Sequence, residues 1–106
     1  MIMKIAIVSA CSAGIASTYM AAESLELAAK KKGHTAYVET QGTIGIENAI
    51  SLKDAQSADI VIIARDIKIQ GMERFKGRKI IEVGVAEAIR KADLIIERAE
   101  KEVIGK

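Results

Sequence analysis

The residues that could do chemistry gather in one short stretch, 11–18, which reads Cys-Ser-Ala-Gly-Ile-Ala-Ser-Thr. Cys11 is the only cysteine of the chain, and it lies between an apolar run typical of a strand and an alanine-rich run typical of a helix. A strand that turns directly into a helix leaves free backbone N–H groups and the positive end of the helix dipole at one spot, where anions bind. The same field favours a thiolate, the nucleophilic form of cysteine. Stretch 11–18 therefore predicts an anion-binding loop with a reactive sulfur.

Three familiar phosphate loops do not fit the letters of this stretch. A dinucleotide-binding fingerprint needs spaced glycines, and only Gly14 is present; a Walker A loop needs a lysine, and none lies between Cys11 and Thr18. A cysteine phosphatase places an arginine at the position that Ser17 occupies here. Phosphate charge must then be held by backbone N–H groups, by the hydroxyls of Ser12, Ser17 and Thr18, and by the helix dipole. Such a site suits a phosphoryl carrier better than a phosphatase, because it lacks a guanidinium to speed hydrolysis.

Composition narrows the classes of function further. A net charge of +2, with two tyrosines, one phenylalanine and no tryptophan, is too little for a nucleic-acid-binding surface. One cysteine and one histidine cannot assemble a zinc site of the usual kind, and a lone cysteine makes no internal disulfide, as is normal in the reducing cytoplasm. No run approaches the ~20 apolar residues of a membrane span. We expect a cytoplasmic protein that is not inserted in a membrane, binds no nucleic acid and holds no metal.

Strand and helix patterns alternate along the chain. The predicted elements are strands at 4–10, 35–40, 58–64 and 79–83, helices at 15–32, 47–57 and 85–103, and polar connections at 41–46 and 65–78. Short crossovers between such elements imply right-handed βαβ units and a parallel sheet. We predict an α/β fold of the Rossmann-like or flavodoxin-like kind. It is a single three-layer domain over 1–106, with a four-stranded parallel sheet in the order 2-1-3-4 flanked by helices.

The predicted strand order brings distant segments to the cysteine. It places the switch point between the first and third strands, so Cys11 lies at the carboxyl edge of the sheet, in the crevice where open α/β folds bind ligands. The loops after the second and third strands open on the same edge. We expect a site rim there, formed by Gln41, Gly42, Arg65 and Asp66. We expect the phosphate-binding residues to be Ser12, Ala13, Gly14, Ile15, Ala16, Ser17 and Thr18.

Four local features carry further expectations. His34 directly follows the end of the first helix, where a solvated turn residue is expected. Ser51 is expected to cap a helical turn that has Asp54 at its third position. The last helix is expected to break near Asp93. The basic connection 65–78 is either ordinary solvated surface or an electropositive rim for a phosphorylated or acidic partner.

Two segments, 11–23 and 38–48, carry a family resemblance. The first is similar to the phosphocysteine loop of fructose-type enzyme IIB components of the bacterial sugar phosphotransferase system, and the second resembles a further segment of that family. Weaker similarity at 59–68 and 74–77 extends the resemblance over nearly the whole chain. The family usually has a proline directly after the cysteine and a histidine six positions on, where this chain has Ser12 and Ser17. We expect the Ser17 hydroxyl to substitute in part for that imidazole.

The resemblance implies an activity and partners. Cys11 would accept a phosphoryl group from a phosphohistidine of the IIA domain and pass it to a sugar bound by the membrane component IIC. The sugar would be fructose or a fructose-like sugar, and the activity that of a protein-phosphocysteine–sugar phosphotransferase. No metal, nucleotide or other cofactor takes part in this step. Two alternatives remain open, namely a non-catalytic regulatory or interaction domain of the same fold and a thiol phosphatase.

Overall fold

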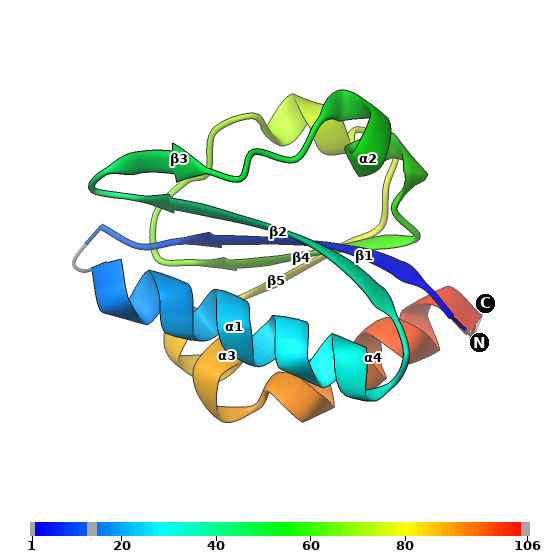
Figure 1. The fold of residues 1–106 in the computed structure, drawn as a ribbon. Coiled ribbons are helices and arrows are strands. Elements are labelled where there is room, and N and C mark those ends of the chain that lie inside the picture. The colour runs from blue at the N-terminus through cyan, green and yellow to red at the C-terminus, as the bar shows by residue number, and fades with distance from the viewer. Residues whose placement is uncertain (1, 13–14, 105–106) are drawn as a thin grey trace.

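A five-stranded sheet is the central layer of the computed structural model, which describes residues 2–12 and 15–104. Its order is β3-β2-β1-β4-β5, with β3 antiparallel to β2 and all other pairs parallel (Figure 1). The strands are β1 (Lys4–Ala10), β2 (Thr35–Gly42), β3 (Gly45–Glu47), β4 (Ile60–Arg65) and β5 (Ile80–Val83). The helices are α1 (Ile15–Lys31), α2 (Leu52–Ser57), the 3-10 helix η1 (Met72–Phe75), α3 (Val85–Arg90) and α4 (Ala92–Ile104).

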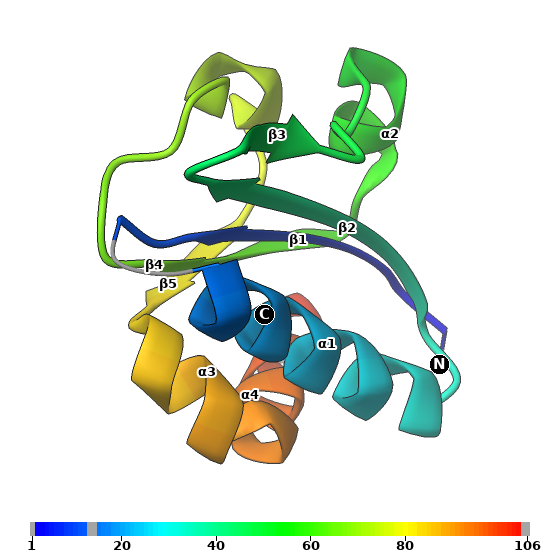
Figure 2. The ribbon, with the colours of Figure 1, turned by 60° about the vertical axis from the view of Figure 1, so that its left-hand side comes forward.

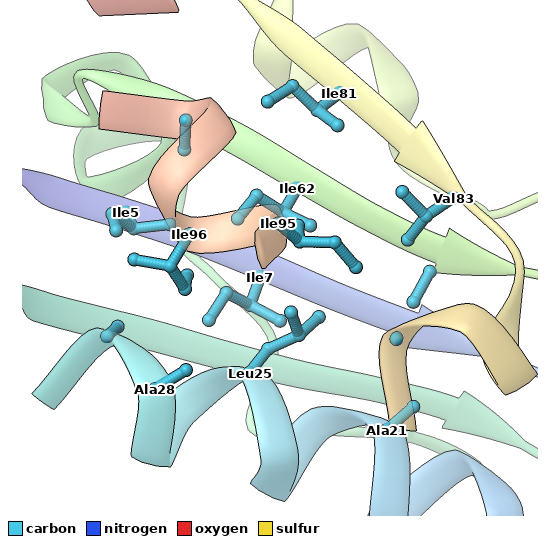
Figure 3. Packing of buried hydrophobic residues seen from close by; sticks show 14 of the residues in the cluster. Ile5, Ile7, Ala21, Leu25, Ala28, Ile62, Ile81, Val83, Ile95 and Ile96 are labelled. Carbon is cyan, nitrogen blue, oxygen red and sulfur yellow. The ribbon is translucent and has the colours of Figure 1, made fainter. Parts of the chain in front are cut away.

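Helices cover both faces of the sheet, which gives three layers (Figures 1 and 2). On the face covered by α1, α3 and α4, Ile5 and Ile7 of β1 belong to the same buried cluster as Leu25 of α1 (Figure 3). On the face covered by α2 and η1, the intervening residues Ala6 and Val8 belong to a second cluster. Successive side chains of a strand point to opposite faces, so a strand covered on both faces is apolar throughout. The predicted three-layer α/β fold is confirmed.

The predicted order of the four parallel strands is also confirmed, since β2-β1-β4-β5 corresponds to 2-1-3-4. The strand count was wrong, because the expected loop 41–46 instead forms a hairpin. β2 continues to Gly42, which pairs with Gly45 at the start of β3. Gly45 has a φ of 105°, in the left-handed region that glycine adopts without a steric penalty. Two glycines flanking a two-residue turn are the local signal for this hairpin.

The predicted helix 47–57 is shorter than expected, because the end of β3 and an irregular segment occupy its first residues. Asn48 has a φ of 55°, which a continuous right-handed helix does not allow. α2 begins only after Ser51, whose Oγ accepts a hydrogen bond from the Asp54 N–H at 3.1 Å. The predicted Ser51 cap is therefore confirmed, and it marks the true start of the helix.

The end of α1 shows one clear error of the sequence analysis. Gly33 turns the chain with a φ of 83°, but His34 after it is buried rather than solvated. Its Nδ1 accepts a hydrogen bond from the Met3 N–H at 3.0 Å, so the proton lies on Nε2, which donates to Glu100 of α4 at 2.7 Å. This hydrogen bond, followed by one from Lys32, lowers the pKa of Glu100. Both ring nitrogens are thus satisfied, which is why the ring can be buried.

The expected break in the last helix is present, two residues before Asp93. Lys91, with φ −127° and ψ 34°, separates α3 from α4. An apolar stripe of α3 and α4 packs on the α1 side of the sheet; its members are Val85, Ile89, Ala92, Ile96, Ala99 and Val103. Across residues 2–12 and 15–104, no helix combines the length and the apolar character needed to span a bilayer.

Candidate functional site

Cys11 lies directly after β1, between the ends of the two strands that flank it. Its backbone N–H donates to the carbonyl of Gln41 in β2 at 3.4 Å, and the Asp66 N–H donates to the carbonyl of Ala10 at 3.0 Å. The order of the parallel strands reverses at β1: the chain first adds β2 on one side of β1 and then adds β4 on the other side. Such a switch point at the carboxyl edge is where open α/β sheets bind ligands. The predicted placement of Cys11 is therefore the observed one.

Among the described residues, the side chains of Asp66 and Ser17 form hydrogen bonds with the sulfur of Cys11. The thiol donates a hydrogen bond to Oδ2 of Asp66 at 3.3 Å, and the Ser17 hydroxyl donates one to Sγ at 3.5 Å. Ser17 lies in the first turn of α1, which contains no acidic residue to weaken the positive end of its dipole. Cys11 itself is only 3% exposed, although a nucleophile that meets a partner must be reachable. The sulfur thus has a hydroxyl donor and a carboxylate acceptor beside it, and it must become accessible when a partner docks.

The predicted phosphate-binding stretch divides into described and undescribed parts. Ala13 and Gly14 lie outside the described residues, and Ile15 is described only through its backbone, which begins α1. Among the others, Ser12 and Ala16 are exposed and Ser17 is half-buried.

Among the side chains of this stretch that the structure describes, Thr18 is the most enclosed, with 2% exposure. Its carbonyl accepts a hydrogen bond from the Ser9 hydroxyl at 2.9 Å, which fastens the first turn of α1 to β1. Its Oγ1 lies 4.0 Å from the point where a Cβ on Gly42 would stand. The Thr18 side chain therefore faces β2 inside the protein, where it positions the first turn of α1.

The four expected rim residues have different positions. Asp66 reaches Cys11 with its carboxylate, Gln41 reaches it through its backbone carbonyl, and Gly42 faces Thr18. Arg65 does not point to the sulfur, because its Nη2 pairs with Oε1 of Glu82 in β5 at 3.2 Å. Arg65 is the last residue of β4 and Asp66 is the first residue after it, so their side chains have different partners.

A buried ionic network beside the site was missed by the sequence analysis. Glu39 in β2 has no exposed surface. Its Oε1 accepts from Arg74 Nη1 at 2.6 Å and from the Ile50 N–H at 2.7 Å, and its Oε2 accepts from Gln41 Nε2 at 2.7 Å and from Arg74 Nη2 at 3.1 Å. Burial raises the pKa of Glu39, but these hydrogen bonds and the Arg74 charge outweigh burial and lower the pKa below its ordinary value. The carboxylate is therefore charged and fully paired.

This network fixes the connection after β4 against β2. The Gln41 side chain donates to the Gln70 carbonyl at 3.0 Å and accepts from the Gln70 N–H at 2.8 Å. Arg74 adds bonds to the carbonyls of Gly71 and Ile50, each at 2.7 Å. The only local signal was a glutamate on the expected polar face of a strand and an arginine in a basic connection. Neither pattern shows that the two side chains meet.

A second contact joins α1 to the hairpin at the same edge. The Tyr19 hydroxyl donates to Oε1 of Glu47 in β3, which also accepts from Thr40 Oγ1 at 3.4 Å. The hydrogen bond to Glu47, then burial and the Glu47 charge, raise the pKa of Tyr19 above its ordinary value of 10.0. The hairpin is therefore attached to the helix that begins at the cysteine loop.

Metal binding has no support in the described ranges, which hold no cluster of three or more His, Cys, Asp or Glu side chains placed to ligate an ion. A surface hollow of about 640 Å³ lies between α1 and the α3–α4 junction, lined by residues that include Leu27 and Leu94. It lies beside the later turns of α1, away from the cysteine.

Known proteins are similar to this chain in sequence, and a solved structure is similar to it in fold. The family described as "PTS system, Lactose/Cellobiose specific IIB subunit" matches residues 6–98. Over 97 residues the chain is 50% identical to the PTS system fructose-like EIIB component 2 of Escherichia coli (strain K12), with 92% of each chain covered. Over 96 residues it is 41% identical to the PTS system fructose-specific EIIABC component of Bacillus subtilis (strain 168), covering 91% of this chain and 15% of that one.

A solved structure agrees. The enzyme IIB subunit of the PTS system from Escherichia coli K12, a solution structure, has a TM-score of 0.91 to this chain at 35% identity, covering 99% of this chain and 97% of that one. The family match spans most of β1, the cysteine loop and every later strand. The resemblance that stretch 11–23 predicted is therefore confirmed. This chain belongs to the enzyme IIB family of the bacterial sugar phosphotransferase system.

Proposed function

We propose that this protein carries a phosphoryl group on Cys11 between a IIA phosphohistidine and a sugar bound to IIC. The observation that carries the proposal is the position of the sulfur, at the switch point of the sheet and before the first turn of α1, with the Ser17 hydroxyl at 3.5 Å. In the first transfer the sulfur attacks phosphorus, the S–P bond forms and the P–N bond to the histidine breaks. In the second transfer a sugar hydroxyl attacks phosphorus and the S–P bond breaks.

Two arginines, Arg65 at the end of β4 and Arg74 in η1, support a carrier over a phosphatase. Arg74 is held by the buried Glu39, and Arg65 is paired with Glu82. Neither guanidinium is therefore directed at the sulfur to stabilise the transition state of hydrolysis. Phosphate on Cys11 would be held by backbone N–H groups of 12–18, by hydroxyls and by the dipole of α1. Such a cradle stabilises the bound group without speeding attack by water.

The partners follow from the system to which the family belongs. Two further components would meet this domain in turn, a IIA donor and the membrane component IIC, while residues 1–106 act as one IIB domain in the cytoplasm. The similar protein of Bacillus subtilis supports this proposal, because its name, EIIABC component, combines the letters A, B and C. Exposed apolar side chains in the early turns of α1 and in the turn between β2 and β3, Met20 and Ile44 among them, suit brief contact with such partners.

Fructose or a fructose-like sugar is the substrate class that we propose. The support is the name of the similar Escherichia coli protein, a fructose-like EIIB component. The sugar itself would be bound by IIC, so the residues of this chain select the phosphoryl donor and acceptor proteins.

One observation favours a second candidate, a regulatory domain that does not transfer phosphate. Cys11 is 3% exposed, which would suit a structural thiol. Sugar phosphorylation separates the two candidates. Membranes containing IIC, a IIA protein, the general phosphotransferase proteins and phosphoenolpyruvate are incubated with labelled fructose and either wild type or Cys11→Ser. The proposed function requires sugar phosphate with wild type only; equal yields with both proteins, or none with wild type, favour the regulatory candidate.

A further inference from the structure

The contact between Cys11 and Asp66 points to a second reacting group. A thiol must lose its proton to become the nucleophile, so phosphorylation of the sulfur needs a proton acceptor within reach. Oδ2 of Asp66 lies 3.3 Å from Sγ and already accepts the thiol hydrogen bond. The geometry needed of a general base is thus present before any partner binds.

The surroundings of Asp66 leave its carboxylate available for this task. Charged groups near the carboxyl edge have other partners: Arg65 pairs with Glu82, and Arg74 pairs with Glu39. Within the part of the chain that the structure describes, no ion pair involves Asp66. α1 contributes no acidic residue in its first turn, and Glu47 of β3 is bonded to Tyr19. Lys68, two residues further along the same connection, lines a pocket together with Arg65 and Glu82.

The difference in exposure between Cys11 and Asp66 is a second reason to assign the proton acceptor to Asp66. Cys11 is almost fully enclosed, whereas Asp66 is exposed. A proton released from the enclosed sulfur therefore has a direct path to the solvent side of the protein through this carboxylate.

We propose that Asp66 takes the Cys11 proton when the sulfur is phosphorylated and returns it when the phosphoryl group leaves. This role rests on the proposed phosphocysteine function. As the S–P bond forms and the P–N bond breaks, the S–H proton passes to Oδ2 of Asp66, and the electron pair of the P–N bond stays on the imidazole nitrogen. In the second transfer the sugar oxygen forms its bond to phosphorus. The S–P bond then breaks, the thiolate takes the proton back from Asp66, and the sugar hydroxyl proton goes to a base of the acceptor component.

Transfer of the proton to Asp66 also removes the electrostatic repulsion between its carboxylate and a phosphoryl group on Cys11. A phosphoryl group on sulfur would meet a charged carboxylate at hydrogen-bond distance, and like charges repel. A protonated Asp66 is neutral, and it can donate a hydrogen bond to a phosphoryl oxygen. The same proton thus forms a hydrogen bond in both states of Cys11. Before phosphorylation the Asp66 carboxylate accepts it from the thiol, and after phosphorylation the Asp66 carboxylic acid donates it to the phosphoryl group.

Asp66→Asn tests the role, because asparagine keeps the size of the side chain and the Asp66 N–H but accepts no proton. Single-turnover transfer from phosphorylated IIA to this protein is followed by rapid quench between pH 6 and 9. We expect the rate near neutral pH to fall by roughly 10²–10⁴-fold, the range of a general base, and the deficit to shrink as rising pH ionises the thiol without help. Asp93→Asn, which changes an exposed aspartate at the start of α4, is the matched control and should transfer at the wild-type rate.

The outcomes separate this inference from the proposed function. If wild type accepts no phosphate from IIA, the carrier function is refuted and the Asp66 role with it. If wild type accepts phosphate and Asp66→Asn, with an unchanged melting curve, accepts it as fast or faster at every pH, the Asp66 role alone is refuted. A uniform loss with no pH dependence would also refute it, because it would show that Asp66 only positions the sulfur.

Discussion

Replacing Arg74 with methionine tests the buried network beside the cysteine. Glu39 has no exposed surface and would keep its bonds from the Gln41 side chain and the Ile50 N–H, but would lose both bonds from the guanidinium. Removing one partner of a buried ion pair costs about 3–5 kcal/mol. Because two donors remain on Glu39, we expect the lower end, about 3 kcal/mol. With a urea m-value of about 1–3 kcal/mol/M, the midpoint falls by about 1–3 M.

The assay is urea unfolding followed by far-UV circular dichroism, since the chain has no tryptophan for fluorescence. Arg78→Met is the matched control: Arg78 donates to the carbonyls of Gln56 and Ala58 and forms no ion pair with any residue that the structure describes, so we expect a loss of about 1 kcal/mol. The double variant Glu39→Gln/Arg74→Met should be more stable than Arg74→Met alone, because it removes the unpaired charge. A double variant less stable than that single variant would refute the reasoning.

The pH dependence of the stability difference between wild type and Arg74→Met tests the same buried ion pair in a second way. In wild type the pKa of Glu39 is below its ordinary value of 4.5, so its contribution to stability is fully present above pH 4.5 and is lost as the pH falls through the lowered pKa. In Arg74→Met, burial remains without the opposing guanidinium, and protonation relieves the unpaired charge. The stability difference between wild type and Arg74→Met should therefore narrow as the solution is acidified. A difference that widens in acid would contradict this assignment.

Three further predictions concern single side chains. Ser17→Ala should slow phosphorylation of the sulfur, by roughly the 10-fold that a hydrogen bond of about 1.4 kcal/mol provides; a wild-type rate in rapid quench would show that the hydroxyl does not assist. His34→Leu should lower the free energy of unfolding in urea by about 1–3 kcal/mol, because a buried backbone N–H loses its acceptor; an unchanged midpoint would contradict the burial of the ring. In a Tyr37→Phe background, ultraviolet titration should show Tyr19 ionising above pH 10.0, and Glu47→Gln should bring that transition down; no change on Glu47→Gln would disprove the contact.

Much of the fold could be predicted from local pattern. The apolar strands β1 and β4 could only be central, and the short crossovers fixed their parallel order. β3 was missed because three residues carry no periodicity, and the Gly42–Gly45 pair was interpreted as loop rather than hairpin. His34 was misplaced because its burial depends on Glu100, 66 residues away, which no local pattern indicates.

Local sequence pattern also predicted only part of the candidate site. Topology predicted that the segments after β2 and β4 approach Cys11, and Asp66 does so. Which side chain of the pair 65–66 reaches the sulfur depends on where β4 ends: Arg65, its last residue, pairs with Glu82, and Asp66, the next residue, contacts Cys11. Long-range polar pairs such as Glu39 and Arg74 need the fold before they can be recognised.

The central claim is that the Cys11 sulfur carries the phosphoryl group. Intact-protein mass spectrometry measures this directly after incubation with phosphoenolpyruvate, the general phosphotransferase proteins and a IIA partner, with fragmentation to locate the modified residue. We expect wild type to gain the mass of one phosphoryl group, located on Cys11, and Cys11→Ser to gain none. Unmodified wild-type protein, or a phosphoryl group located on another residue, would contradict the account.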